Sequence, residues 1–293
     1  MDFFFRLLFI VLSKLPLPLL HAGGMVLGWA SFLLSRRYRQ RLLSHARQAG
    51  QSRWLALAAV GEAGKMAAEL PRLWLGRPVQ VGWEGAAHIE AALAHGRGVL
   101  FLTPHLGCFE VAGQALAARF GDRLPLTGLY RPAQQPWLRE IMRSARNRPG
   151  LHTVPTTLAG VRQLIRALKA AQAVILLPDQ VPPQGQGVWA AFHGRPAYTV
   201  TLPARLAHSS GAQLLLIWGE RLRWGRGYLV HVRPFLAGGG AALALDAQAA
   251  ARQINQAMEA LVRECPQQYL WSYHRFKQPA PPAPAHAAVP GHD

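Results

Sequence analysis

The pair of side chains best placed for chemistry is a histidine followed five positions later by a glutamate, His105 and Glu110. Residues with this spacing face different sides of a continuous helix, but Gly107 lies between them and gives the backbone the freedom to turn. A carboxylate bonded to one imidazole nitrogen fixes the tautomer, so the other nitrogen can take a proton from a hydroxyl. The pattern predicts His105 as a general base oriented by Glu110. A surface histidine beside a helix-capping carboxylate is the alternative.

The residues around this pair predict a strand, a turn and a helix. Residues 97–103 form a short apolar run typical of a strand, and residues 109–119 are Ala-rich and helix-like. Ligands of open α/β sheets bind beyond the carboxyl ends of strands, so His105 lies where a catalytic residue is expected. Cys108 is expected to be a small packing residue rather than a nucleophile.

Two further polar residues directly follow predicted strands. Arg131 follows residues 124–130 and Asp179 follows residues 173–177, so both are expected at the same edge of the sheet as His105. Arginine binds phosphate through two parallel hydrogen bonds, which suits Arg131. The alternatives are a turn cap for Asp179 and solvated charges at helix ends for Arg131, Arg146 and Arg148.

The rest of the chain alternates strand-like and helix-like segments. The predicted strands also include 212–218 and 227–233, and the predicted helices are 136–147, 157–171, 200–209 and 246–264. This alternation predicts an α/β fold in which helices flank a mostly parallel mixed sheet. We assign residues 36–277 to this domain, with a helical segment at its start, and interpret the Pro- and Ala-rich residues 278–293 as a disordered tail.

Composition points to an anionic partner at a membrane. Of the 293 residues 51% are hydrophobic and 16% charged, with 32 Lys and Arg against 14 Asp and Glu, a net charge of +18. An excess of this size favours binding to anions. The arginines are scattered through an apolar chain, which favours a membrane surface over nucleic acid as the partner. Cys108 and Cys265 form no metal-ligand set, and no nucleotide-binding fingerprint occurs, so we expect no metal and no cofactor.

The first 35 residues are almost continuously apolar. Residues 15–34 contain no Lys, Arg, Asp or Glu, and about 20 such residues can cross a bilayer. Pro16 and Pro18 also permit a helix that lies in the interface. The arginines that follow are expected on the cytoplasmic side: Arg36, Arg37, Arg39, Arg41 and Arg47. Residues 1–35 are therefore predicted to be a membrane anchor. A buried helix pair and a signal peptide are the alternatives.

Several motifs, taken in order, resemble those of the bacterial lipid A late acyltransferases, the lauroyl and myristoyl transferase family. After His105-x4-Glu110 the chain contains Tyr130-Arg131-Pro132, Arg146-Asn147-Arg148, Pro178-Asp179-Gln180, Phe192-His193-Gly194 with Ala197 and Thr199, Pro266 to Trp271, and His274-Arg275-Phe276-Lys277. The resemblance runs from the N-terminal anchor to about Lys277. The chain departs from the family at His193, where an aromatic residue is usual, and after Gln180, where an acidic residue is often found.

The resemblance implies a glycerol-phosphate-acyltransferase-like fold and an enzyme at the cytoplasmic face of the bacterial inner membrane. It implies a donor, acyl carrier protein thioester, and an anionic lipid A precursor as acceptor, whose acyl chain offers a hydroxyl. It also implies catalytic roles for His105, Glu110, Arg146 and Asp179, and substrate-binding roles for Arg131 and Arg148, with a phosphate contact for Arg131. Another glycolipid or lysophospholipid acyltransferase, and a basic membrane-surface protein without catalysis, are the competing hypotheses.

Overall fold

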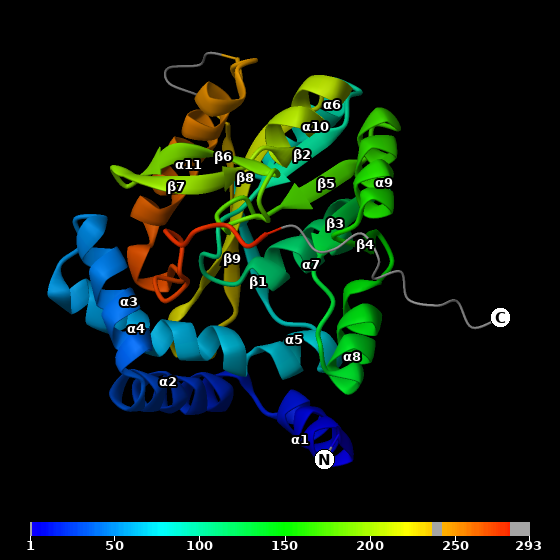
Figure 1. The fold of residues 1–293 in the computed structure, drawn as a ribbon. Coiled ribbons are helices and arrows are strands. Elements are labelled where there is room, and N and C mark those ends of the chain that lie inside the picture. The colour runs from blue at the N-terminus through cyan, green and yellow to red at the C-terminus, as the bar shows by residue number, and fades with distance from the viewer. Residues whose placement is uncertain (1, 236–241, 282–293) are drawn as a thin grey trace.

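A mixed sheet forms the centre of the molecule, and helices cover both of its faces (Figure 1). The computed structural model describes residues 2–235 and 242–281. Within these ranges seven strands form the sheet, in the order β1 (Val81–Glu84), β9 (Tyr228–Pro234), β8 (Gln213–Arg221), β2 (Val99–Leu102), β5 (Ala173–Leu176), β3 (Leu126–Tyr130) and β4 (Leu151–Pro155). Only β8 and β9 pair antiparallel among these neighbours. The predicted α/β fold with a mostly parallel mixed sheet is confirmed.

The strands alternate their side chains between two apolar cores. In β2, Leu100 and Leu102 face one core, and Val99 and Phe101 face the other. All four side chains are buried, as expected for a strand of a parallel sheet covered on both faces. This two-sided burial explains why the run is continuously apolar.

Different helices cover the two faces. Helix α2 (Leu17–Leu34) supplies Phe32 to the first core and Leu17 to the second. The other helices that contribute to the first core are α3 (Arg36–Gln48), α4 (Arg53–Ala68), α9 (Leu158–Lys169), α10 (Leu202–Ser210) and α11 (Ala247–Glu264). Those that contribute to the second are α5 (Leu70–Leu75), α6 (Ala87–Ala94), α7 (Phe109–Phe120) and α8 (Pro136–Arg146). A separate antiparallel hairpin, β6 (Gly187–Phe192) and β7 (Arg195–Val200), packs against α11. Two short 3₁₀ turns, η1 (Arg223–Gly225) and η2 (Pro266–Gln268), complete the elements.

The apolar N-terminal segment forms two helices along one end of the domain (Figure 1). These are α1 (Asp2–Lys14) and α2 (Leu17–Leu34), separated at Pro16. Glycines let helix α2 pack closely on α4. A Cβ atom at Gly28 would overlap the Val60 carbonyl, and one at Gly64 would overlap the Gly24 carbonyl. Among the described residues, α2 alone is long and apolar enough to cross a bilayer by length and composition, and 33% of it is buried in the protein.

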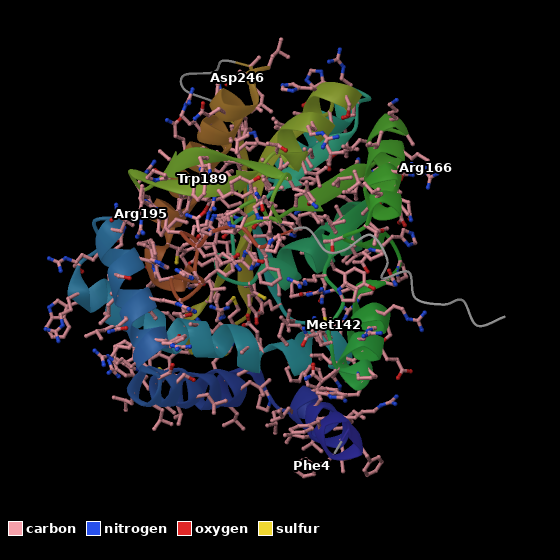
Figure 2. All side chains as sticks on the ribbon, viewed as in Figure 1. Phe4, Met142, Arg166, Trp189, Arg195 and Asp246 are labelled. Atoms are coloured by element: carbon pink, nitrogen blue, oxygen red, sulfur yellow. The ribbon has the colours of Figure 1, made fainter. Side chains whose placement is uncertain are left out.

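The opposite faces of these two helices are apolar and exposed. On α1 and α2 the exposed large apolar residues are Phe3, Phe4, Phe5, Leu7, Leu8, Ile10, Val11, Leu19, Met25, Val26, Leu27, Trp29, Leu33 and Leu34. Figure 2 shows Phe4 at the far end of the molecule from Asp246. At the other terminus, Ala280 accepts a backbone hydrogen bond from Gln184 N–H at 2.9 Å. Residues 282–293 of the predicted tail lie outside the described residues.

Candidate active site

The sheet brings His105 and Asp179 together because the strands that precede them are neighbours. β2 and β5 are parallel, with Leu102 opposite Leu176. The chain leaves both strands at the same edge of the sheet, and Pro104 and Pro178 lead directly into the two functional residues. The carboxyl ends of neighbouring parallel strands thus supply the histidine and the carboxylate, although 74 positions separate them.

The Asp179 carboxylate binds His105 at two atoms. The ring Nδ1–H donates to Oδ1 at 2.7 Å, and the backbone N–H donates to Oδ2 at 2.8 Å. This leaves the ring Nε2 as an acceptor, which receives a hydrogen bond from the exposed Gln180 side-chain amide at 3.0 Å. The Asp179 side chain is 2% exposed and the His105 side chain 14%, so the carboxylate is buried behind an imidazole that still reaches solvent.

Asp179 stays ionised despite this burial. Burial by itself raises the pKa of a carboxyl group, but the charge of His105 and the two hydrogen bonds from it outweigh that effect and lower the pKa of Asp179 below its usual value. An ionised carboxylate at Nδ1 holds the imidazole in the tautomer that a general base needs.

The turn after His105 is fixed by backbone contacts on both sides. Gly107 has a φ of +58°, and a Cβ atom there would overlap the Gly219 carbonyl. The backbone N–H groups of Leu106, Gly107 and Cys108 donate to the carbonyls of Pro104, Gln268 and Gly219. Because these donors are occupied, they are not free to stabilise a developing oxyanion. These three hydrogen bonds instead hold the turn that carries His105.

The predicted contact between His105 and Glu110 is wrong. Glu110 lies in the first turn of α7 and binds Arg146 through both of its oxygens. Trp74 Nε1–H also donates to Glu110 at 3.2 Å, and the Arg146 guanidinium lies over the Trp74 ring at 5.4 Å. The first turn of α7 points Glu110 toward α5 and α8, so this carboxylate holds an arginine instead of the imidazole.

A cleft of about 380 Å³ extends from His105 to the ion pair of Glu110 and Arg146. His105, Glu110, Arg131 and Arg146 all line it. The remaining lining is mostly apolar and includes Phe109, Leu129, Met142, Leu151, Ile175, Leu176, Leu177, Val200 and Leu202. The cleft therefore combines an imidazole, two guanidinium groups and apolar walls, a combination that suits a substrate with a polar head and a hydrocarbon chain.

The three predicted arginines have different surroundings. Arg131 is exposed at the cleft and forms no ion pair with any residue that the structure describes. Arg146 is held by Glu110. Arg148 does not line the cleft: its Nη2 donates to the Leu73 and Trp74 carbonyls at 2.7 and 3.1 Å, and its Nη1 to Gln114 at 3.2 Å. Arg148 therefore links α5 to α7, and its predicted role in substrate binding stays a prediction.

Cys108 follows Gly107 in the same turn as His105, but its thiol is unsuited to nucleophilic attack. Its side chain is buried, and burial raises the pKa of the thiol well above its usual value. The thiolate is the reactive form of cysteine, so the expectation of a packing role agrees with its surroundings. In residues 2–235 and 242–281, no group of three His, Cys, Asp or Glu side chains could hold a metal ion.

A buried network of charged and polar side chains around Arg221 and Glu69 supports the turn that carries His105, and no local sequence pattern predicts it. Arg221 donates to Glu69 at 2.8 and 2.7 Å and to the Gly107 carbonyl at 3.0 Å. Glu69 is fully buried and also receives hydrogen bonds from Tyr228 at 2.8 Å and from His21 at 3.1 Å. The network thus connects the N-terminal helix α2 to the turn that carries His105.

The later motifs also pack together, behind the site. Arg275 is buried, and its guanidinium donates to the Tyr198 carbonyl at 2.7 Å and to Thr199 Oγ1 at 2.8 Å. It lies over the Phe192 ring at 5.2 Å. His193 occupies the turn between β6 and β7 with a φ of +46°. These residues join the hairpin to the C-terminal segment, and that segment holds the turn that carries His105 through Gln268.

A family model matches most of the chain. The model described as bacterial lipid A biosynthesis acyltransferase covers residues 48–278. This range includes the whole sheet, the cleft and the His105–Asp179 pair. It begins in α3, after the two apolar N-terminal helices.

Curated relatives align over a shorter part. The lipid A biosynthesis lauroyltransferase of Escherichia coli (strain K12) is 29% identical over 197 residues, 66% of this chain and 60% of the relative. The lipid A biosynthesis acyltransferase of Haemophilus influenzae is 25% identical over 191 residues, 64% of this chain and 56% of the relative. A phosphatidylinositol mannoside acyltransferase of Mycobacterium tuberculosis is 30% identical over 147 residues, 48% of this chain and 45% of the relative. The chain thus spans less than two thirds of the length of each.

Proposed function

Because the chain belongs to the bacterial lipid A biosynthesis acyltransferase family, we propose that it transfers a fatty acyl chain from acyl carrier protein to a lipid A precursor. The acceptor group is a hydroxyl on an acyl chain that the precursor already carries. The observation that supports this most directly is the His105–Asp179 pair at the head of an apolar cleft. A hydroxyl is a poor nucleophile at neutral pH, so its attack on a thioester requires a base at that position.

The reaction proceeds by direct attack. His105 Nε2 accepts the hydroxyl proton, in the position that the Gln180 amide occupies in this structure, while the hydroxyl oxygen forms a bond to the thioester carbonyl carbon. The carbon–sulfur bond then breaks, and His105 returns the proton to the departing thiolate. Asp179 stabilises the imidazolium between these steps. No acyl-enzyme is needed, in keeping with the burial of Cys108.

The two cleft arginines take separate parts. Arg146 keeps N–H groups beyond those bound to Glu110, and it supplies a positive charge for the developing oxyanion. Glu110 and Trp74 act through Arg146 by fixing its guanidinium. Arg131 is exposed at the mouth of the cleft and binds a phosphate of the acceptor.

The exposed apolar faces of α1 and α2 support a position on a membrane. We place the enzyme at the cytoplasmic face of the bacterial inner membrane, because the arginines of α3 follow directly after the apolar segment. The lipid acceptor would then reach the cleft from the bilayer.

A second candidate is acylation of a different glycolipid. The mycobacterial relative, named for a phosphatidylinositol mannoside acceptor, aligns with 48% of this chain. An inositol phospholipid also carries a phosphate, and the His105–Asp179 chemistry would be unchanged.

A reconstituted assay tests the function and separates the two candidates. The full-length protein in neutral detergent is mixed with acyl carrier protein thioester and one of three acceptors: a hydroxyacylated lipid A precursor, the same precursor without the chain hydroxyl, or a phosphatidylinositol mannoside. Mass spectrometry should find one added acyl chain on the first acceptor alone. Transfer to the mannoside alone would replace the acceptor assignment, and transfer to none of them would reject the proposal.

A further inference from the structure

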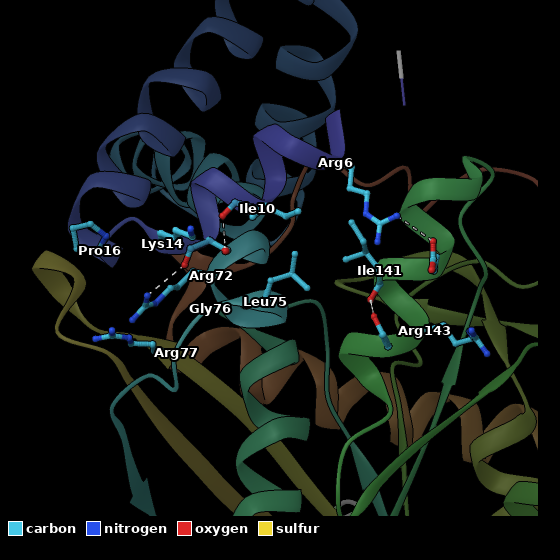
Figure 3. Close-up of a pocket in the computed structure, with 13 residues that line it drawn as sticks. Arg6, Ile10, Lys14, Pro16, Arg72, Leu75, Gly76, Arg77, Ile141 and Arg143 are labelled. Atoms are coloured by element: carbon cyan, nitrogen blue, oxygen red, sulfur yellow. Dashed lines mark hydrogen bonds and ion pairs between the residues drawn. The ribbon is translucent and has the colours of Figure 1, made fainter. Parts of the chain in front are cut away.

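A second cavity lies on the other side of α8 from the cleft and beside α1 (Figure 3). Its volume is about 970 Å³. Residues from α1, from α5 and the loop after it, and from α8 form its walls. Met142 and Arg146 line the cleft, whereas Ile141 and Arg143 line this cavity. Helix α8 is thus the shared wall between two sites.

Five of the thirteen residues that line this cavity are basic. They are Arg6, Lys14, Arg72, Arg77 and Arg143, and the acidic residue among the lining positions is Glu140. Arg6 and Glu140 pair with each other at 3.7 Å, which leaves an excess of positive charge. Figure 3 shows Lys14, Arg72 and Arg77 gathered on one side of the cavity, next to Pro16 and Gly76.

The arginines in this group have unused donors. Arg72 Nη1 donates to the Ser13 carbonyl at the long distance of 3.4 Å, and Arg72 Nε is buried with no hydrogen-bond partner. Across the described ranges, Lys14 and Arg77 form no ion pair and no side-chain hydrogen bond. A buried N–H without an acceptor is costly, so the cavity favours a ligand that brings anionic oxygens.

The position of the cavity identifies the kind of ligand. Helix α1 exposes an unusual number of large apolar side chains: Phe3, Phe4, Phe5, Leu7, Leu8 and Val11. Such a helix is typical of a segment that lies in the membrane interface with its apolar side inserted between the lipids. Ile10 belongs to both surfaces, since it lines the cavity and is 38% exposed. The basic side chains behind it then lie at the depth of the lipid headgroups.

We infer that this cavity binds the phosphate of an anionic phospholipid, with Lys14, Arg72 and Arg77 around the headgroup and the acyl chains along the exposed side of α1. The inference rests on the membrane position given under the proposed function, but not on the proposed reaction. A lipid bound there would contact α8, the helix that carries Arg146 into the cleft.

Lipid retention by the full-length protein tests this without any turnover. The protein is purified in neutral detergent, mixed with equal amounts of phosphatidylglycerol and phosphatidylcholine, and examined by native mass spectrometry. The wild type should retain phosphatidylglycerol preferentially. Arg77→Gln and Arg72→Gln should each weaken that retention about fivefold, the usual contribution of one basic residue near an anionic headgroup. Arg72→Lys, which keeps the charge, should retain more than Arg72→Gln.

Arg166→Gln is the matched control, because it removes the same charge from α9, far from α1 (Figure 2). Equal loss in the control would mean diffuse attraction by the net charge and would overturn the site. So would unchanged retention in the Arg72→Gln/Arg77→Gln double variant. If that variant keeps phosphatidylglycerol but raises the KM of the phosphorylated glycolipid acceptor, the cavity belongs to the acceptor and the phospholipid assignment is wrong. Thermal melting of each variant separates these outcomes from misfolding.

Discussion

The carboxylate of Asp179 accepts two hydrogen bonds from His105, one from the ring and one from the backbone N–H. The backbone contact fixes the position of the residue, and the ring contact fixes the tautomer. Both depend on the adjacency of β2 and β5 in the sheet. A carboxylate in this arrangement and the imidazole it holds should behave as one catalytic unit.

A double-mutant cycle tests that unit. His105→Ala should lower kcat by roughly 10²–10⁴-fold, the usual span for loss of a general base. Asp179→Asn should act in the same direction, because an amide does not hold the Nδ1–H tautomer. Adding Asp179→Asn to His105→Ala should lower kcat only slightly further, because the effects of substituting residues that act as a unit are not additive. Glu110 contacts Arg146 instead of His105. The loss of kcat caused by Glu110→Gln should therefore multiply with the loss caused by His105→Ala.

The cycle has a clear contrary result. If Glu110→Gln is silent in the His105→Ala background while Asp179→Asn still lowers kcat, the carboxylate that serves the base in the substrate complex is Glu110. His105→Gln, which can keep a hydrogen bond to Asp179, controls for the burial of an unpaired carboxylate. Melting temperatures in detergent should be compared for all variants.

Cys108 provides a test of direct attack. Its thiol is buried, with a pKa raised well above the usual range, so Cys108→Ala should retain near-wild-type turnover in the purified protein. Intact mass spectrometry during turnover should find no acylated protein. An acyl group trapped on Cys108 would contradict direct attack and require a two-step route.

The elements could be predicted from the sequence with good boundaries. The predicted helices 136–147 and 246–264 correspond to α8 and α11, and the predicted strand 173–177 corresponds to β5. The strands β1 and β4 and the hairpin of β6 and β7 are not among the predicted elements. Their residues are only partly buried, so they lack the continuous apolar runs that reveal the central strands.

The pairing of site residues could not be predicted in the same way. The sequence shows that His105 and Asp179 each follow a strand, but not that these strands are neighbours. Glu110 is close to His105 in the chain, yet the first turn of α7 directs it to Arg146. Arg221 and Glu69 are 152 positions apart, and no local pattern marks a buried ion pair that depends on the packing of α4, α5 and β8.

Arg131 should control recognition of the acceptor phosphate. It lines the cleft without an ion-pair partner among the described residues, so a substrate phosphate is its natural partner. Arg131→Gln should raise the KM of the phosphorylated acceptor about 10- to 150-fold, because a hydrogen bond to a charged group contributes about 1.5–3 kcal/mol. The same variant should differ little from the wild type with a dephosphorylated acceptor.

The comparison of the two acceptors decides the role of Arg131. Equal increases of KM for both would indicate that this arginine holds the donor or the fold. Arg166→Gln again serves as the control for net charge, since it lies on the helix after β4 and does not line the cleft.

Glu69 should dominate the acid side of the stability curve. Burial alone would raise its pKa, but the charge of Arg221 and the hydrogen bonds from Arg221 and His21 lower it from 4.5 to about 2. A carboxyl group with a lowered folded-state pKa contributes stability that is present above its unfolded pKa and lost as pH falls through the folded pKa. This part of the stability should therefore disappear between pH 4.5 and about pH 2.

Glu69→Gln measures that contribution. It leaves the fully buried Arg221 without its main counter-charge, so the free energy of unfolding at neutral pH should fall by about 3–5 kcal/mol. The loss of stability on acidification should become shallower than in the wild type. Glu90→Gln, which removes an exposed carboxylate paired with Arg123, should change little. If the free energy of unfolding falls equally steeply below pH 4.5 in Glu69→Gln and in the wild type, another group is responsible for the loss of stability in acid.

The N-terminal helices should be needed for folding as well as for membrane binding. Deleting residues 1–35 removes α2 from the close glycine contacts with α4 and removes the His21 donor from Glu69. The apolar surface of α4 that α2 covers would face water, so the shortened protein should leave the membrane fraction as an aggregate instead of a soluble monomer.

Deleting residues 2–14 removes α1 alone and should preserve the melting temperature better while weakening vesicle binding. Size-exclusion chromatography in detergent and sedimentation with vesicles distinguish these outcomes. If the full-length protein is monodisperse and soluble without detergent, the exposed apolar face of α1 and α2 does not meet a membrane, and the proposed location is wrong.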